Sequence, residues 1–171
     1  MSKNVDALNR KLLAAACDAT KKAKDIRELI RNGADIHCQN EWGMTPVMLA
    51  AQNNSSVVVL NALIAAGADI KATEPKYRSN SLHLAAGNSN NPKIIETLIK
   101  NGADLNSVNY LGETALIMAV NSNKSTRVVS ALIKAGADIH ASDYQGHTVL
   151  EYARANKRTY IINTLKKLGC N

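Results

Sequence analysis

The sequence contains no phenylalanine and one tryptophan, and aromatic residues make up 4% of its 171 residues. A core without large rings must be packed from alanine, leucine, isoleucine and valine, which favours thin helices in close contact. Cysteine is also scarce. Cys17, Cys38 and Cys170 are odd in number and far apart, so they do not indicate a disulfide framework. This composition is typical of a folded protein in a reducing compartment.

Long apolar segments are missing too. The longest apolar stretch, from Val57 to Ala68, is interrupted by Asn61 and Gly67, and it is shorter than the roughly 20 residues that span a bilayer. The first residues of the chain lack the continuous apolar core of a secretory signal. We therefore expect a cytoplasmic protein without membrane insertion, although export by a signal-less route would leave the same sequence.

Catalytic and metal-binding motifs are absent as well. The chain has no glycine-rich phosphate loop and no His-Glu-x-x-His. His37 and Cys38 are neighbours, and neighbouring residues of an extended segment point to opposite sides, which disfavours a metal site between them. The sequence therefore predicts no enzyme, no cofactor and no bound metal.

The net charge of +7 is unevenly distributed along the chain. The excess lies in residues 1–40 and 150–171, whereas residues 41–149 are neutral. Terminal units of a repeat array expose a face that internal units bury, so charge at both ends favours solubility. A neutral middle offers no basic track to a phosphate backbone, and this disfavours nucleic-acid binding.

What the chain does have is a repeated Gly-Ala-Asp sequence. Successive copies are 34, 35 and 34 residues apart, and an eroded copy, Leu-Gly-Cys-Asn, ends the chain. A period of this length indicates a repeat array. The glycines of the five copies are Gly33, Gly67, Gly102, Gly136 and Gly169.

Each repeat can be interpreted as a helix, a turn and a second helix. Before Gly102, apolar residues from Ile94 to Ile99 recur at helical spacing, and glycine at this point is typical of a helix end. A polar segment containing Gly112 follows and suits a turn or hairpin. Thr114 then precedes another apolar run, so we expect its hydroxyl to cap the next helix.

The segments after these turns carry a shared motif. Gly43-Met44-Thr45-Pro46-Val47-Met48-Leu49-Ala50-Ala51 is the fullest copy, and residues 80–86, 112–120 and, more weakly, 146–153 match it. The motif resembles the Gly-x-Thr-Pro-Leu-His-x-Ala-Ala of ankyrin-repeat proteins, and the resemblance covers essentially the whole chain. It implies an all-α solenoid of stacked antiparallel helix pairs with projecting β-hairpin or loop fingers. It also implies that His83, at the motif's histidine position, supports hydrogen bonding between repeats.

The resemblance further implies a single domain over residues 1–171. The repeats would cover about 5–36, 37–70, 71–105, 106–139 and 140–171. The first and last depart most from the motif and are rich in lysine and arginine, so we expect them to cap a complete array.

Two departures from the family pattern are visible. The turns within the three central repeats, at residues 53–56, 88–92 and 121–125, are one residue longer than usual and rich in asparagine and serine. We interpret them as structural turns, with a polar binding edge as the alternative. The segment 71–79 lacks the usual glycine and is one residue longer than the other fingers, so we expect a different shape there.

Ankyrin-repeat proteins use their concave face to hold other proteins, and the resemblance transfers that surface to the fingers of this chain. Four of the six aromatic residues fall at finger tips, one in each finger. Aromatic side chains concentrate binding energy at interfaces, but such rings could equally pack on the next finger and stiffen the row. The candidate protein-binding residues are Glu41, Trp42, Met44, Lys76, Tyr77, Arg78, Tyr110, Leu111, Glu113, Tyr144, Gln145 and His147.

The sequence therefore predicts a non-enzymatic module that binds a protein partner and acts as an adaptor, inhibitor or effector. We expect it to be a monomer. A structural or self-assembling repeat protein is the alternative from another class, and a nucleic-acid-associated protein is the third interpretation.

Overall fold

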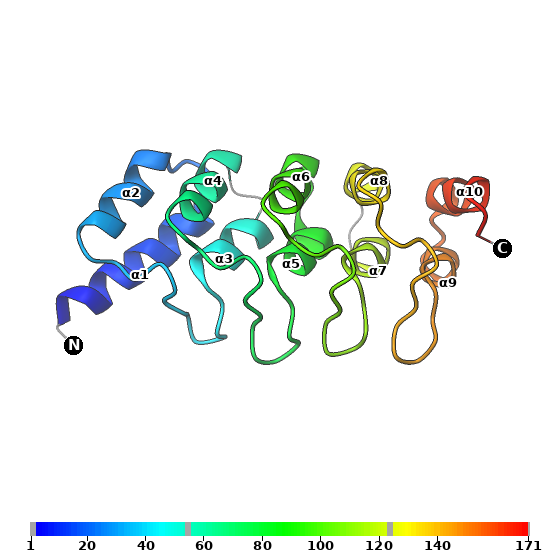
Figure 1. Ribbon diagram of the computed structural model, residues 1–171, viewed down its shortest axis with the longest axis horizontal. Helices are drawn as coiled ribbons and strands as arrows, with labels where there is room; N and C mark the ends of the chain where they lie inside the picture. Colours follow the sequence, from blue (N-terminus) through cyan, green and yellow to red (C-terminus); the bar gives the residue numbers. More distant parts are fainter. Residues whose placement is uncertain (1–2, 54–55, 123–124, 171) are drawn as a thin grey trace.

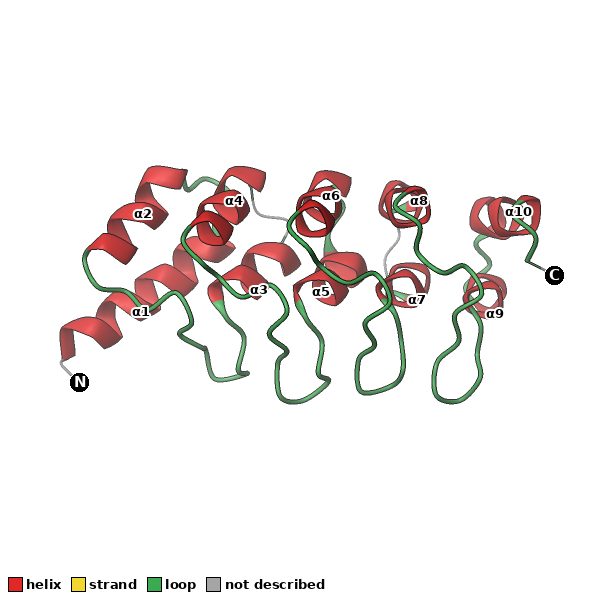
Figure 2. Cartoon of the chain, in the orientation of Figure 1, coloured by secondary structure: helices red, strands yellow, loops and turns green. Residues whose placement is uncertain are grey.

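The computed structural model describes residues 3–53, 56–122 and 125–170, and these residues form ten helices and no β-strand. The helices follow one another in pairs that stack into an elongated array, with the two termini at opposite ends (Figure 1). Figure 2 shows two layers of helices, with loops projecting beyond one of them. The predicted all-α solenoid with projecting fingers is confirmed.

The inner layer lies on the side from which the loops project (Figure 1). Each inner helix contacts the next one along the array, and each outer helix covers its partner. The inner helices are α1 (Lys3–Cys17), α3 (Pro46–Gln52), α5 (Ser81–Asn88), α7 (Ala115–Asn121) and α9 (Val149–Ala155). The outer helices are α2 (Ala23–Arg31), α4 (Val57–Ala65), α6 (Pro92–Lys100), α8 (Thr126–Lys134) and α10 (Thr159–Lys167).

Polar residues begin the inner helices. The hydroxyl of Thr114 accepts a hydrogen bond from the N–H of Ile117 at 3.3 Å, which confirms the expected cap of α7. Before α5, the side chain of Asn80 accepts from the first-turn amides. Thr45 holds the same position before α3, although its buried hydroxyl has no hydrogen-bond partner among the described residues. Pro46 follows it as the first helical residue, where an amide proton is not needed.

Glycine ends the outer helices. After α6, Gly102 has a φ of 90°, a conformation that costs an L-residue free energy because of its side chain. In this conformation the N–H of Gly102 donates to the carbonyl of Ile99, and the N–H of Ala103 donates to that of Leu98. Two carbonyls at the helix end thereby accept from residues beyond the helix.

Small residues bring the inner helices together. Ala50 and Ala51 of α3 and Ala85 and Ala86 of α5 are all fully buried. A larger side chain at these positions would push neighbouring helices apart, so alanine sets the close spacing of the layer. The large aliphatic side chains of the core come from both layers of helices.

His83 joins two successive repeats, as the resemblance implies. Its Nε2 lies 2.9 Å from the carbonyl oxygen of Ser107, in the loop of the next repeat, and its Nδ1 accepts the N–H of Asn80 at 3.3 Å. Burial lowers the pKa of His83, so the ring is neutral at pH 7. A neutral ring can satisfy one donor and one acceptor at the same time, which is what this position requires.

Parts of the long polar turns, residues 54–55 and 123–124, lie outside the described residues. The prediction of a structural or binding role for those turns therefore stays a prediction. Within the described chain, none of the helices has the length and apolar character needed to cross a membrane.

Candidate functional site

The four fingers are the loops at residues 37–44, 71–79, 106–113 and 140–147, and a side-chain acceptor closes each of them. In the first finger, Oδ1 of Asn40 accepts hydrogen bonds from the N–H groups of Trp42 and Met44 at 3.0 and 2.9 Å. Asn109 and Asp143 do the same in the third and fourth fingers. These bonds fix the backbone of the tip and so the direction of its side chains.

The second finger is built differently, as its sequence predicts. The Glu74 carboxylate accepts hydrogen bonds from the N–H groups of Lys76, Tyr77 and Ser79 at 2.7 to 3.1 Å. The longer glutamate side chain spans the additional residue of this finger. Arg78 has a φ of 54°, at the point where the other three fingers have glycine.

Backbone hydrogen bonds link neighbouring fingers. The N–H of Tyr110 donates to the carbonyl oxygen of Tyr77 at 2.7 Å, and the N–H of Tyr144 donates to that of Leu111 at 3.0 Å. Pro75 holds the equivalent position in the second finger and has no N–H to offer the first. Its ring packs directly on the backbone of the first finger instead.

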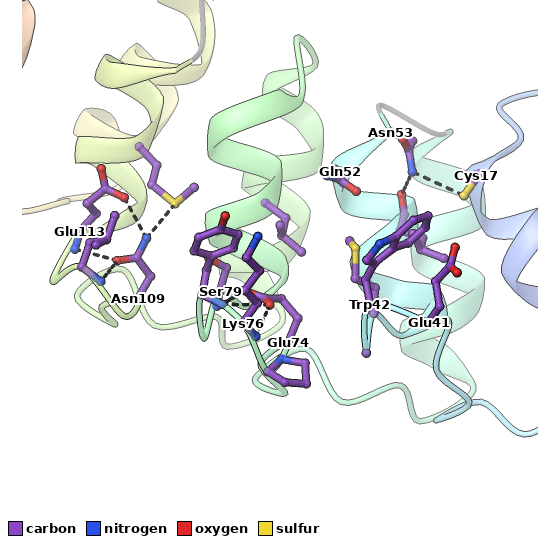
Figure 3. A pocket seen from close by; sticks show the side chains of 18 residues that line it. Cys17, Glu41, Trp42, Gln52, Asn53, Glu74, Lys76, Ser79, Asn109 and Glu113 are labelled. Atoms are coloured by element: carbon purple, nitrogen blue, oxygen red, sulfur yellow. Dashed lines mark hydrogen bonds between the residues drawn. The ribbon is translucent and has the colours of Figure 1, made fainter.

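A groove of about 1020 Å³ opens between the first three fingers and the inner helices (Figure 3). Each of these fingers contributes one exposed large hydrophobic side chain to the lining: Trp42, Tyr77 and Leu111. They hold matching positions, each just before the residue with positive φ. Their exposed fractions are 65%, 48% and 46%, so large apolar surface faces solvent along one line of the molecule.

Three inner helices form the floor of this groove. Leu49 of α3, Leu84 of α5 and Met118 of α7 line it, and each stands four residues after the residue that precedes its helix. Gly87 of α5 leaves room for the Met118 methyl group, which would lie 3.4 Å from an added Cβ. Unbranched methionine adapts to the shape of a ligand, so this part of the floor can adjust.

The groove is acidic although the protein is basic. Glu41, Glu74 and Glu113 line it, and Lys76 is the one basic side chain among its described lining residues. The Lys76 ammonium group lies 4.7 Å from the centre of the Tyr77 ring, so its charge is held against its own finger.

The other two finger aromatics lie elsewhere. Tyr110 and Tyr144 line a second depression of about 390 Å³ together with Arg78 and Gln145. They stand one position earlier in their fingers than Trp42 does in the first. The four rings predicted as one row are therefore divided between two surfaces. The signal in the sequence is the position of each ring relative to the residue with positive φ in its finger.

The Tyr144 ring also packs on the third finger. An added Cβ at Gly112 would lie 2.6 and 2.7 Å from two of its ring carbons. This contact supports the stiffening interpretation for Tyr144. Aromatic stacking along the fingers is not seen in the described chain, where the ring contact found joins His147 and Tyr152 at 6.0 Å between centroids.

A family model for ankyrin repeats, described as three copies, matches residues 12–109 and 82–171. The chain belongs to the ankyrin-repeat family. A comparison with curated proteins gives no match. Ankyrin repeats are in general modules for binding other proteins and are typically non-enzymatic.

Within this ankyrin array, seven of the predicted site residues line the groove and one predicted residue lines neither surface. His147 lies 3.2 Å from Asp143 and meets the ring of Tyr152 edge-on. The Tyr152 hydroxyl donates to Asp143 at 2.8 Å, and burial together with this acceptor raises its pKa to about 12. The groove residues from the prediction are Glu41, Trp42, Met44, Lys76, Tyr77, Leu111 and Glu113.

The ankyrin pattern could have revealed the floor residues that sequence reasoning missed. Leu49, Leu84 and Met118 are apolar residues at one fixed distance after the helix start, so their spacing carries the signal. Asn109 and the exposed Cys17 also line the groove, but no sequence pattern indicates this, because their positions there depend on how the repeats stack. No cluster of metal-ligating side chains occurs in the described part of this ankyrin chain.

Proposed function

We propose that this ankyrin-repeat protein binds a segment of a partner protein in the groove, and acts as an adaptor, inhibitor or effector through that contact. The observation that supports this is the line of exposed Trp42, Tyr77 and Leu111 above an apolar floor. Large exposed apolar patches with a polar rim mark interaction sites in soluble proteins. Aromatic residues in such a groove supply hot spots of about 2 kcal/mol or more each.

The fingers are well suited to present this surface. Backbone N–H groups at the tips donate hydrogen bonds to the side-chain oxygens of Asn40, Glu74 and Asn109, so little conformational freedom remains to be lost when a partner binds. Preorganisation of this kind raises affinity without additional contacts. The groove spans three fingers, which suits an extended or helical segment better than a small molecule.

Two matched double variants test the groove. Affinity capture from a lysate of the source or host cell would compare Trp42→Ala/Tyr77→Ala with Tyr110→Ala/Tyr144→Ala, each verified as folded by circular dichroism and thermal unfolding. The first pair removes groove surface, whereas the second removes equivalent rings outside it. We expect a partner that the wild type and the second variant retain and the first variant loses.

Other outcomes would contradict the groove. Equal retention by both variants would move the contact to another surface, and loss from the Tyr110/Tyr144 variant alone would move it to the second depression. Capture of no protein other than the chain itself would favour a self-assembling role, which sedimentation velocity at several concentrations would measure directly.

A further inference from the structure

We propose that the segment bound in the groove carries a lysine or arginine side chain beside apolar side chains, and that the Glu113 carboxylate receives this cation. The inference rests on the proposed function. It concerns the chemistry of the partner, which neither the family nor the finger pattern specifies.

Charge complementarity is the first observation. The chain carries a net charge of +7, yet the groove contains three carboxylates and one ammonium group. The carboxylates extend along the groove from Glu41 in the first finger to Glu113 in the third (Figure 3). A concave surface with low-dielectric walls concentrates the field of such charges, and this attracts a partner of opposite sign.

Glu74 contributes charge but has no capacity for a ligand. Its two oxygens accept four hydrogen bonds from the backbone of its own finger. A carboxylate offers about four lone-pair positions, so all of them are used. Its role is to close the finger, and the recognition of a cation must come from another residue.

Glu113 has that capacity. It is 6% exposed, one oxygen accepts from Nδ2 of Asn109 at 2.9 Å, and the other accepts from Nδ2 of Asn121 at 3.3 Å. With these two donors from the described residues, each oxygen keeps an acceptor position for a ligand. Both amide donors are neutral, so they orient the carboxylate without balancing its charge.

No counter-charge for Glu113 comes from the described chain. No lysine or arginine of the described residues forms an ion pair with it. His83 is close enough to sense its charge, but burial keeps that ring neutral at pH 7. A buried carboxylate without a counter-charge costs free energy even when neutral groups hydrogen-bond it, and a cation from a bound segment would recover part of that cost.

The finger backbone does not require a carboxylate at this position, although Glu113 accepts a hydrogen bond from the finger-closing Asn109. Asn109 closes the third finger, and the residues that correspond to Glu113 in the other fingers are Met44, Ser79 and His147. Apolar, small polar and imidazole side chains are thus all compatible with the finger. The neighbouring groove residues Leu111 and Met118 would pack on the aliphatic part of a lysine or arginine side chain.

A display library of random 12-residue peptides, selected on the full chain and counter-selected on Trp42→Ala, provides the probes. We expect the enriched peptides to carry lysine or arginine next to aliphatic or aromatic residues. In binding measurements by fluorescence anisotropy, Glu113→Gln should weaken the best peptide at least about tenfold, because it keeps the shape and removes the charge. Glu96→Gln, on the exposed side of α6, is the matched control and should have almost no effect.

Replacing the basic peptide residue by methionine completes a double-mutant cycle. The wild type should lose about tenfold in affinity for that peptide, whereas Glu113→Gln should bind both peptides equally. If Glu113→Gln does not fold, the wild type still tests the inference. It should bind the methionine peptide more weakly than the basic one, and this difference in affinity should become smaller at high salt.

The outcomes separate the two proposals. Enrichment of acidic or uncharged peptides that depend on Trp42 would overturn the inference and leave the proposed groove function standing. The same holds for basic peptides that depend on Trp42 but whose affinity changes neither with Glu113→Gln nor with replacement of their basic residue by methionine. Absence of any peptide that depends on Trp42 would overturn both.

Discussion

At the scale of single residues, Arg78 has the positive φ that glycine has in the other three fingers. Its positive φ is one that costs non-glycine residues about 1 kcal/mol or more. The Glu74 carboxylate holds the finger in this shape through its hydrogen bonds to the surrounding amides. The strain is thus local and is offset within the same loop.

We expect Arg78→Gly to raise the free energy of unfolding by up to about 1 kcal/mol, because glycine adopts positive φ without a side-chain clash. Urea unfolding followed by circular dichroism would measure it. Arg78→Ala is the control, since it removes the guanidinium group but keeps the strain. An equal gain from alanine would attribute the effect to the charge rather than to the backbone.

His83 gives the chain a predictable response to acid. Burial lowers its pKa below the ordinary value of 6.5, so below that pH the unfolded chain binds a proton that the folded chain does not. Its contribution to stability is therefore intact above about pH 6.5 and is lost as the pH falls. The sign follows from burial, which disfavours the charged ring and outweighs the hydrogen bond to the Ser107 carbonyl, an interaction that acts in the opposite direction.

Unfolding free energies at pH 7 and pH 5.5 would test this. We expect wild type to be less stable at the lower pH, and His83→Gln to show a smaller decrease because it takes up no proton. His37→Gln changes an exposed histidine of the first finger and should leave the decrease unchanged. A decrease of the same size in the His83 variant would show that other groups control the acid response.

At the scale of elements, the second, third and fourth fingers form a row connected by backbone hydrogen bonds. Backbone bonds join the second finger to the third and the third to the fourth, whereas Pro75 interrupts the series toward the first. The Tyr144 ring and backbone lie directly on Gly112, which leaves no space for a side chain there. The fingers are in such close contact that adding one methyl group at Gly112 should measurably lower the free energy of unfolding.

Gly112→Ala and Gly146→Ala form a matched pair for this measurement. Both positions have positive φ, at 82° and 86°, but an added Cβ meets Tyr144 within 2.7 Å at the first and open space at the second. Alanine should cost about 1 kcal/mol at Gly146 from backbone strain alone, and about 1 to 3 kcal/mol more at Gly112 from overpacking. Chemical unfolding of both variants would measure this difference. Equal losses in the free energy of unfolding would mean that the third and fourth fingers can move apart without a loss of stability.

At the scale of the whole molecule, the array is held together by contacts between neighbouring repeats. Among the described helices, α5 and α6 have packed neighbours on both sides, whereas α9 and α10 have them on one side. In such one-dimensional arrays, stability is the sum of repeat and interface contributions, so the ends open before the centre. The groove lies over the first three fingers, mostly away from the C-terminal end.

Hydrogen exchange followed by mass spectrometry would show this distribution. We expect amides of α5 and α6 to exchange more slowly than those of α9 and α10, and a peptide bound in the groove to slow exchange in the first three fingers further. Uniform protection along the chain would instead indicate that the array unfolds as one cooperative unit.

The sequence alone determined the repeat architecture, because period, helix caps and closing glycines are local signals that follow from backbone geometry. Gly102, Thr114 and His83 were each assigned to the role that the structure shows. The different build of the second finger was also predictable, since a missing glycine and one additional residue change the turn.

Only the tertiary structure decided which finger residues share a surface. Trp42 and Tyr110 differ by one position within their fingers, and only the fold shows that this shift places one ring in the groove and the other in the second depression. The charge of the groove likewise emerges only when Glu41 and Glu113, far apart in the chain, line the same cavity. Local signals specify each repeat, but a binding surface is made by side chains from several repeats, and their directions depend on the stacking and on the hydrogen bonds that hold each finger.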